Sequence, residues 1–424
     1  MTIRRDPCVP VPSVRTAAAV MLVCGAVCGS ARAQGPTFQG VGFMPGGMQD
    51  ESYAYAVSAD GQFVVGQGTS SIGVQAFRWT AGGGFTPLGT LAGYSSTPAR
   101  GVSGDGSVVA GYSAGAVSDQ AVRWTNGGGL QGLGFLTGGT TSAAYGISAD
   151  GAVLVGGGNS AGPTQAFRWT VANGFEPLGF LPSGNFSTAY GISGDGLVIV
   201  GQSNSLNGLE AFRWTGAGMV GLGDLPGGAP SSVAYAASAD GSVVVGQGNS
   251  ASGAEAFRWT SAGMVGLGDL AGGGFASAAL AVSADGTRVV GFGTAAAGSV
   301  AFLWDAANGM RPLDQALASA GASGLAGWTL QRANGISADG NVIVGTGIDP
   351  QGRPQGWIAR LPSCYANCDG STTAPVLNVL DFGCFLNQFA AGDSRANCDA
   401  STTVPVLNVL DFNCFLNRFA AGCS

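Results

Sequence analysis

Apolar and polar positions follow a pattern that repeats every 45 residues over most of the chain. In the copy around Trp259, an Asp-Gly dipeptide separates the first two apolar runs, which is a strong signal for a β-hairpin. We predict four strands in this copy, at residues 233–238, 243–247, 256–259 and 264–268. Because four short strands in about 40–45 residues are typical of a β-propeller blade, the pattern predicts an array of such blades.

Two markers give the number of copies. Six tryptophans stand 45 positions apart: Trp79, Trp124, Trp169, Trp214, Trp259 and Trp304. A Ser-Ala/Gly-Asp-Gly turn precedes each of them and occurs once more, with its aspartates at Asp60, Asp105, Asp150, Asp195, Asp240, Asp285 and Asp339. The chain therefore holds seven copies. The last step is 54 residues long, and its added length falls in the Ala-rich stretch 311–327, where we expect a short helix.

The two ends of the array complement each other. Residues 38–43, before the first copy, match the fourth-strand phrase at 220–223, and the seventh copy stops after its third strand near Leu361. Pairing these ends would complete one blade and remove the exposed edges of an open array. We therefore predict an all-β, seven-bladed β-propeller over residues 34–361, closed by its N-terminal strand. An open β-solenoid is the alternative.

The recurring phrases resemble those of a known family. Gly-Leu-Gly-x-Leu-x-Gly-Gly, Ser-Ala-Asp-Gly, Val-Val-Val-Gly and Glu-Ala-Phe-Arg-Trp-Thr recur in phase over about residues 37–361. In this region the chain resembles the HAF-type extracellular repeats of bacterial secreted proteins. The resemblance implies an extracellular location and this fold, but it implies no settled chemistry.

Residues present in nearly every copy are assigned structural roles. We expect the turn aspartates to accept hydrogen bonds from turn backbone groups and the tryptophans to pack between neighbouring blades. We expect the repeated arginines to pair with turn carboxylates or carbonyls: Arg78, Arg123, Arg168, Arg213 and Arg258. Catalysis would instead need carboxylates that break the repeat, and the candidates are Glu51, Asp119, Glu176, Glu210, Asp224, Glu255, Asp269 and Asp305.

Composition argues against several classes of function. The 424 residues include no His and no Lys, and the net charge is −7. Without His there is neither a Ser-His or Cys-His nucleophile system nor an imidazole metal ligand. Without a basic patch there is no means of displacing the counterions of a nucleic acid. We therefore expect neither an enzyme nor a nucleic-acid partner.

The first 33 residues have the features of a signal peptide. Arg4 and Arg5 precede a short apolar stretch at 16–28, and Ala31-Arg32-Ala33 fits a cleavage site. The apolar stretch is too short to span a bilayer comfortably. We predict a secreted or cell-surface protein with no transmembrane segment after cleavage.

Residues 362–424 form a second, cysteine-rich region. All six cysteines of the mature chain lie here: Cys364, Cys368, Cys384, Cys398, Cys414 and Cys423. An even number in so short a secreted segment indicates disulfides that staple a small domain. Residues 367–392 recur as 397–422, and Cys364 and Cys423 lie outside this duplication. We predict that these two pair as a clasp and that the inner four pair within or between the copies.

Each copy of the tail combines a polar loop with an amphipathic helix. Phe382, Phe385, Leu386 and Phe389 share one helical face in the first copy, as do Phe412, Phe415, Leu416 and Phe419 in the second. With the polar loops before them, these segments resemble the cysteine-bearing dockerin-like tails of some secreted bacterial proteins. The resemblance implies calcium ligands at Asn367, Asp369, Ser371, Asn378, Asp381, Asn397, Asp399, Ser401, Asn408 and Asp411. Such oxygen ligands suit calcium, although disulfides in place of a metal are the alternative.

The resemblance also implies a partner. In dockerins the two residues before the last loop ligand take part in recognising a cohesin, and here they are Val379, Leu380, Val409 and Leu410. Their alternative role is ordinary core packing.

Together these features predict a secreted, non-catalytic binding or structural protein. Its propeller would bind ligands, glycans among them, through the variable loops between second and third strands, and its tail would attach it to a cohesin-like or cell-surface partner. The alternatives are a carbohydrate-active enzyme delivered by the same tail and a self-assembling component of a surface layer.

Overall fold

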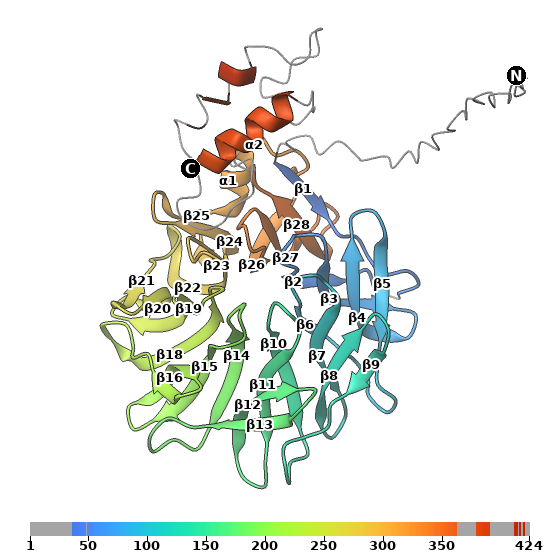
Figure 1. Cartoon of the computed structure of the whole chain (residues 1–424), viewed down its shortest axis with the longest axis vertical. Helices are drawn as coiled ribbons and strands as arrows, with labels where there is room; N and C mark the ends of the chain where they lie inside the picture. The colour runs from blue at the N-terminus through green and yellow to red at the C-terminus, as the bar shows by residue number, and fades with distance from the viewer. Residues whose placement is uncertain are drawn as a thin grey trace, which may run out of the picture.

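The computed structural model describes residues 36–47, 49–362, 379–390, 411–413, 415–416 and 419. Among the described residues from 36 to 362 the regular secondary structure is β-strand apart from one short helix, and four-stranded units stand around a common centre (Figure 1). This arrangement is that of a β-propeller, which confirms the prediction of an all-β, propeller-type fold. No helix among the described residues has the length and apolarity needed to cross a membrane.

Each unit runs from an inner strand near the centre to an outer strand at the rim. The first unit contains β2 (Ser52–Val57), β3 (Val64–Ser70), β4 (Gly73–Thr80) and β5 (Gly84–Gly89). The second contains β6 (Ala99–Val102), β7 (Val108–Ala114), β8 (Asp119–Thr125) and β9 (Gly129–Gly132). The third contains β10 (Ser142–Ile147), β11 (Val153–Asn159), β12 (Thr164–Thr170) and β13 (Gly174–Gly179).

The next three units belong to one twelve-stranded sheet, because single parallel bridges join Leu209 to Ser231 and Ala254 to Ala276. The fourth unit contains β14 (Ser187–Ile192), β15 (Ile199–Ser205), β16 (Gly208–Thr215) and β17 (Gly218–Gly221). The fifth contains β18 (Gly227–Ala237), β19 (Val244–Ser250), β20 (Gly253–Thr260) and β21 (Gly263–Gly266). The sixth contains β22 (Gly272–Val282), β23 (Arg288–Ala295), β24 (Gly298–Asp305) and β25 (Gly309–Pro312).

The last sheet combines the two ends of the array. It contains β26 (Thr329–Ile336), β27 (Val342–Ile348) and β28 (Pro354–Arg360), and β1 (Thr37–Gly40) completes it. The β1 strand pairs antiparallel with β28, with Phe38 opposite Ala359, and Figure 1 shows the blue strand beside the orange one. Phe38 packs with Trp357 and with Leu313 and Leu317 of α1 (Leu313–Ser319), the expected short helix.

The turn between the first two strands of a unit owes its shape to Ser, Asp and Gly. In the first unit Ser58 Oγ donates to Asp60 Oδ1 (2.5 Å), and the amide of Gln62 donates to the same oxygen (3.0 Å). The amide of Phe63 donates to Ser58 Oγ (2.9 Å). Gly61 adopts a φ of +70°, which residues with a side chain rarely adopt. These contacts confirm that the turn aspartates accept hydrogen bonds from the turn backbone.

The turns are also hydrogen-bonded to one another. An amide in each turn donates to a carbonyl in the next, in the series Ala59 to Gly104, Gly104 to Ala149, Ala149 to Gly194, Asp195 to Ala239, Ala239 to Ala284, Ala284 to Ala338, and Ala338 back to Ala59. Every donor–acceptor distance lies between 2.8 and 3.0 Å. The seventh bond therefore returns to the turn where the series began.

The continuous apolar run of the second strands reflects burial on both faces. Neighbouring side chains of a strand point to opposite faces, and here both faces are covered by sheets. Val64 packs against Val342 and Val344 of the last unit, whereas Val65 packs with Val109 of the second unit. The Val-Val-Val-Gly phrase is thus the core of two interfaces at once.

A phenylalanine of the third strand, rather than the tryptophan, is the fully buried residue of most interfaces. Five of these side chains have no exposed surface: Phe77, Phe167, Phe212, Phe257 and Phe302. The tryptophans pack at the margin of the same interfaces, as expected, and Trp79 is 6% exposed. In the last copy Trp357 occupies the phenylalanine position and is fully buried.

The described part of the tail contains α2 (Val379–Ala390) and a second helical segment at 411–413 and 415–416. The rings of Phe385 and Phe415 stack with centroids 4.1 Å apart, and both side chains are buried. Leu386 and Leu416, which the sequence places on the same apolar faces, are instead 40% and 38% exposed. The apolar contact between the two copies is therefore formed by the phenylalanines.

Candidate functional site: the central cavity

Every innermost strand contains a β-bulge at the same place. In β10 the pairing with β11 skips one residue between Ala144 and Gly146, and the same shift occurs in the other six inner strands. The skipped residues are Tyr55, Arg100, Tyr145, Tyr190, Tyr235, Leu280 and Asn334. A bulge redirects the side chain of its extra residue, so each unit aims one side chain toward the centre.

The glycine of the Val-Val-Gly phrase makes room for the bulge. A Cβ on Gly66 would lie 1.8 Å from the carbonyl oxygen of Tyr53, and one on Gly156 would lie 1.9 Å from that of Ala143. No side chain fits there without moving the backbone. Gly191 is restricted for a related reason, because its Cβ would lie 2.5 Å from the carbonyl oxygen of Tyr235 in the next unit.

The seven redirected side chains line one central cavity of about 700 Å³. Tyr53, Gln331, Arg332 and Thr346 also line it, and all the lining residues come from inner strands or from β27. The variable loops between second and third strands, where the sequence suggested ligand contacts, contribute none of them. Those loops instead expose isolated apolar side chains such as Ile72, Val117 and Leu206.

Tyrosine rings form a continuous series along one side of the cavity. The ring centroid of Tyr145 lies 6.0 Å from that of Tyr112 and 5.5 Å from that of Tyr190. The ring centroids of Tyr190 and Tyr235 are 5.8 Å apart. The Tyr190 hydroxyl accepts a hydrogen bond from Gln202 Nε2 (3.0 Å). The rings at the bulges are only partly buried, so they present surface to the cavity.

The tyrosine hydroxyls remain neutral donors and acceptors. Burial raises the pKa of Tyr55, Tyr145 and Tyr235, and raises that of Tyr190 to about 12. Two arginines, Arg100 and Arg332, supply the charge of the cavity, and no Asp or Glu is among its lining residues.

The eight carboxylates considered as catalytic candidates do not line the cavity, although Glu51 accepts a hydrogen bond from the lining residue Tyr53 (3.4 Å). Arg311 forms an ion pair with Asp305 (2.6 Å), and Arg168 lies 3.6 Å from Glu176. Glu210 and Glu255 accept from the amides of Gly223 and Gly268 in their own units. The structure therefore does not bring two of these carboxylates together in this cavity.

The repeated arginines were assigned correctly in part. Arg213 and Arg258 donate to the turn carbonyls of Gly241 and Gly286 in the next unit. Arg78 instead donates to Asn126 and lies 4.2 Å above the ring of Phe63.

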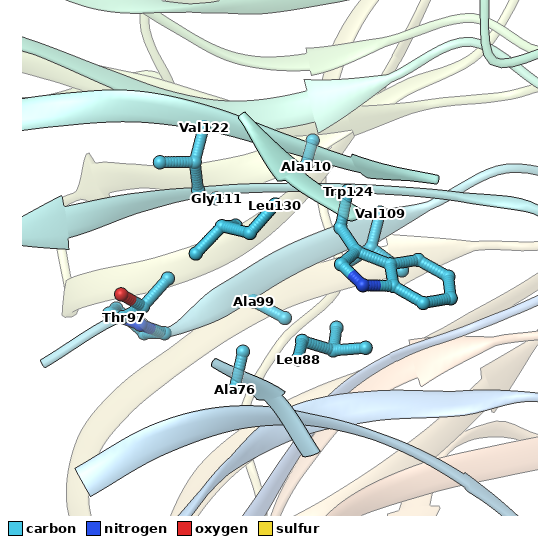
Figure 2. Close-up of a pocket in the computed structure, with 11 residues that line it drawn as sticks. Ala76, Leu88, Thr97, Ala99, Val109, Ala110, Gly111, Val122, Trp124 and Leu130 are labelled. Carbon is cyan, nitrogen blue, oxygen red and sulfur yellow. The ribbon is translucent and has the colours of Figure 1, made fainter. Parts of the chain in front are cut away.

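A second, much smaller cavity of about 10 Å³ lies between the first two units (Figure 2). Ala76 and Leu88 of the first unit line one side, and Val109, Val122 and Trp124 of the second line the other. Val122 stands where five other units have a buried phenylalanine. The gap is therefore a consequence of a smaller side chain in a conserved slot of the repeat.

The tail sites can be placed only in part. Asp381 and Asp411 are fully buried, and Asp381 lies in the first turn of α2. Cys384 is disulfide-bonded. Val379 and Leu380 begin α2, but their side chains lie outside the described set. The other positions predicted from the sequence fall outside the described residues: Asn367, Asp369, Ser371, Asn378, Asn397, Asp399, Ser401, Asn408, Val409, Leu410, Cys364, Cys368, Cys398, Cys414 and Cys423.

The series of tyrosines that lines the cavity was not predicted from the sequence. Its signal was present, since Tyr145, Tyr190 and Tyr235 stand 45 residues apart, each after an Ala and before a Gly or Ala. A glycine inside a strand pattern also indicates a bulge or a close backbone approach, and each Val-Val-Gly carries one. What the sequence did not show is that these positions converge on one cavity.

Comparison with known proteins finds similar solved structures but no family. No family model and no curated protein matches the chain. Among solved structures, it is similar to the β-propeller domain of the Trilobed protease from Pyrococcus furiosus, with 10% identity and a TM-score of 0.49 over 74% of this chain and 94% of that one. An oligogalacturonate lyase in complex with manganese gives 12% identity and a TM-score of 0.45 over 74% and 90%. TolB from Acinetobacter baumannii has 12% sequence identity and a TM-score of 0.39 over 60% of each chain.

Proposed function

We propose that the protein is a secreted, non-catalytic binding protein whose ligand occupies the central cavity of a closed, seven-bladed propeller. The observation that carries the proposal is the repeated bulge, which directs one side chain from each unit into a cavity of about 700 Å³. Bulges are frequent beside functional sites. Folding alone does not require tyrosine there, because Leu280 and Asn334 hold the same position in other units.

Two contacts support a ring of seven blades. The turn hydrogen bonds run through seven turns and return from Ala338 to Ala59. The pairing of β1 with β28 gives the last unit its fourth strand from the opposite end of the array. The first contact joins residues 279 positions apart (338 − 59) and the second joins Phe38 to Ala359, 321 positions apart (359 − 38). An open array would supply neither.

The chemistry of the cavity favours a glycan as the ligand. Partly exposed aromatic rings offer flat apolar faces, and neutral tyrosine hydroxyls with Gln331 and Asn334 offer hydrogen bonds. A cavity of this volume accommodates a small ligand of several rings. An extracellular glycan also agrees with the signal peptide and the HAF-type resemblance predicted from the sequence.

A glycan array with the full-length chain, followed by calorimetry with the best neutral oligosaccharide, tests the proposal. We expect Tyr145→Ala and Tyr190→Ala together to weaken binding about tenfold or more, because two ring contacts are lost. Tyr94→Ala, a tyrosine that does not line the cavity, is the matched control and should bind like the wild type. Absence of glycan binding, or equal affinity of the double variant, would contradict the proposal.

We extend the proposal to the tail, which would act as a dockerin-like module that binds calcium and attaches the propeller to a cohesin-like or cell-surface partner. The disulfide at Cys384, the stacking of Phe385 on Phe415 and the matching burial of Asp381 and Asp411 support a compact, duplicated unit. Calorimetric titration of the full-length chain with calcium tests whether the tail binds the metal. The absence of any binding heat in the oxidised chain would argue for disulfides in place of the metal.

A further inference from the structure

The central cavity contains positive charge without a counterion. Arg100 and Arg332 line it, whereas none of its lining residues is an Asp or a Glu. Within the described part of the chain neither guanidinium forms an ion pair. The chain as a whole is acidic, with a net charge of −7. The cavity therefore differs in sign from the protein that surrounds it.

Aromatic rings hold the guanidinium of Arg100. Its central carbon lies 4.6 Å above the ring of Tyr55 and 5.6 Å from that of Tyr112, and one terminal nitrogen donates to the Tyr112 hydroxyl (3.2 Å). Ring contacts of this kind hold the cation by its face and leave N–H groups at its edge for hydrogen bonds. The orientation of Arg100 is thus set without a carboxylate.

An aromatic ring also contacts the guanidinium of Arg332, which belongs to the last unit. The central carbon of its guanidinium lies 4.1 Å from the centroid of the Phe292 ring. Burial lowers the pKa of Arg332, because desolvation disfavours its charged form. A bound anion would offset that cost.

We infer that the cavity binds an acidic oligosaccharide, with Arg100 and Arg332 receiving its carboxylates while the tyrosine rings pack against its sugar faces. The inference rests on the proposed function and adds the class of glycan. Planar guanidinium groups match planar carboxylates through paired hydrogen bonds. Neutral tyrosine hydroxyls add donors without repelling the anion, because burial raises their pKa.

The test compares a uronate trisaccharide with the same trisaccharide methyl-esterified at every carboxylate, using calorimetry on the full-length chain. We expect the uronate to bind at least about tenfold more tightly than the ester, as hydrogen bonds to charged groups predict. Arg100→Gln and Arg332→Gln should each remove about tenfold from uronate affinity and lower ester affinity much less, because an ester accepts hydrogen bonds but carries no charge. Arg168→Gln, an arginine that does not line the cavity, is the control for loss of one charge.

The outcomes separate this inference from the proposed function. If the uronate and its ester bind equally, and both lose affinity in the Tyr145→Ala, Tyr190→Ala variant, the glycan site stands and its acidic specificity is wrong. If neither trisaccharide binds, the acidic-ligand inference is wrong whatever neutral glycans do. A sulfated trisaccharide that binds more tightly than the uronate would contradict the assignment to carboxylates. Thermal unfolding of each variant checks that the fold is intact.

Discussion

At the scale of single residues, the structure explains why some repeated positions vary and others do not. The phenylalanine position of the third strand is enclosed by two units, so its occupants are apolar and, except for Val122, large, and Phe167 and Trp357 are fully buried. The bulge position faces a cavity, so it accepts side chains as different as Tyr145 and Asn334. Variation within a repeat thus separates enclosed positions from positions that face open space.

Filling the gap beside Val122 should stabilise the protein. Val122→Phe places in the second unit the side chain that five other units carry, and we expect a gain of about 1 kcal/mol in the free energy of unfolding from added apolar burial. The reverse change, Phe167→Val, should cost about 2 kcal/mol because it leaves a cavity. Chemical denaturation measures both. A loss of stability in Val122→Phe would mean that the slot is too small and the ring overpacks it.

At the scale of elements, the hairpin turn depends on the ionised form of its aspartate. Hydrogen bonds from Ser103 and Ser107 lower the pKa of Asp105 to about 2, and those from Ser242 and Ser238 do the same for Asp240. Hydrogen bonds to Asp150 also lower its pKa. The folded pKa lies below the unfolded value, so the stabilisation is complete above about pH 4 and is lost as the pH falls toward 2.

Replacing two of these aspartates should make the melting temperature depend less on pH between pH 2 and 7. We expect Asp105→Asn with Asp240→Asn to lower the melting temperature at pH 7, because a neutral amide accepts hydrogen bonds less strongly than a carboxylate. At pH 2 the difference in melting temperature between the wild type and the variant should be much smaller, since the folded-state carboxylates are then about half protonated and most of their stabilisation is lost. Melting curves by circular dichroism between pH 2 and 7 provide the comparison. A constant difference across that range would contradict the linkage.

At the scale of the whole molecule, the contact between the two ends of the array has the greatest consequence. Phe38 of β1 is 6% exposed and packs with Trp357, and its ring centroid lies 5.2 Å from that of Trp328. The helix α1, which exists only in the last step of the repeat, covers the same cluster through Leu313 and Leu317. The extra residues before the last unit therefore form a helix that covers the contact between β1 and β28.

Truncation of Phe38 should destabilise the whole array. We expect Phe38→Ala to cost about 3–5 kcal/mol, as for other buried phenylalanines, and to expose β28 as an open edge. Phe275→Ala, at a side chain that is 38% exposed, is the matched control and should cost far less. Limited proteolysis with mass spectrometry would locate the first opening, which we expect at β1. Equal stability of the two variants would contradict ring closure.

Much of the fold was readable from the sequence because its signals are local. Asp240-Gly241 indicates a hairpin whatever surrounds it, and the phase of Val-Val-Val-Gly places each buried second strand. The match between residues 38–43 and 220–223 predicted the strand that β28 receives. Repetition strengthened each inference, because every copy of a unit must satisfy the same local rules.

The cavity was decided only by tertiary structure. Tyr55 and Tyr235 are 180 residues apart in the sequence, and no local pattern states that seven bulges point to one centre. The two positive charges of Arg100 and Arg332 belong to different units and line one cavity only because the units curve around a common centre. Local spacing determines the turns and strands of this protein, whereas the meeting of side chains depends on how the units are arranged around their centre.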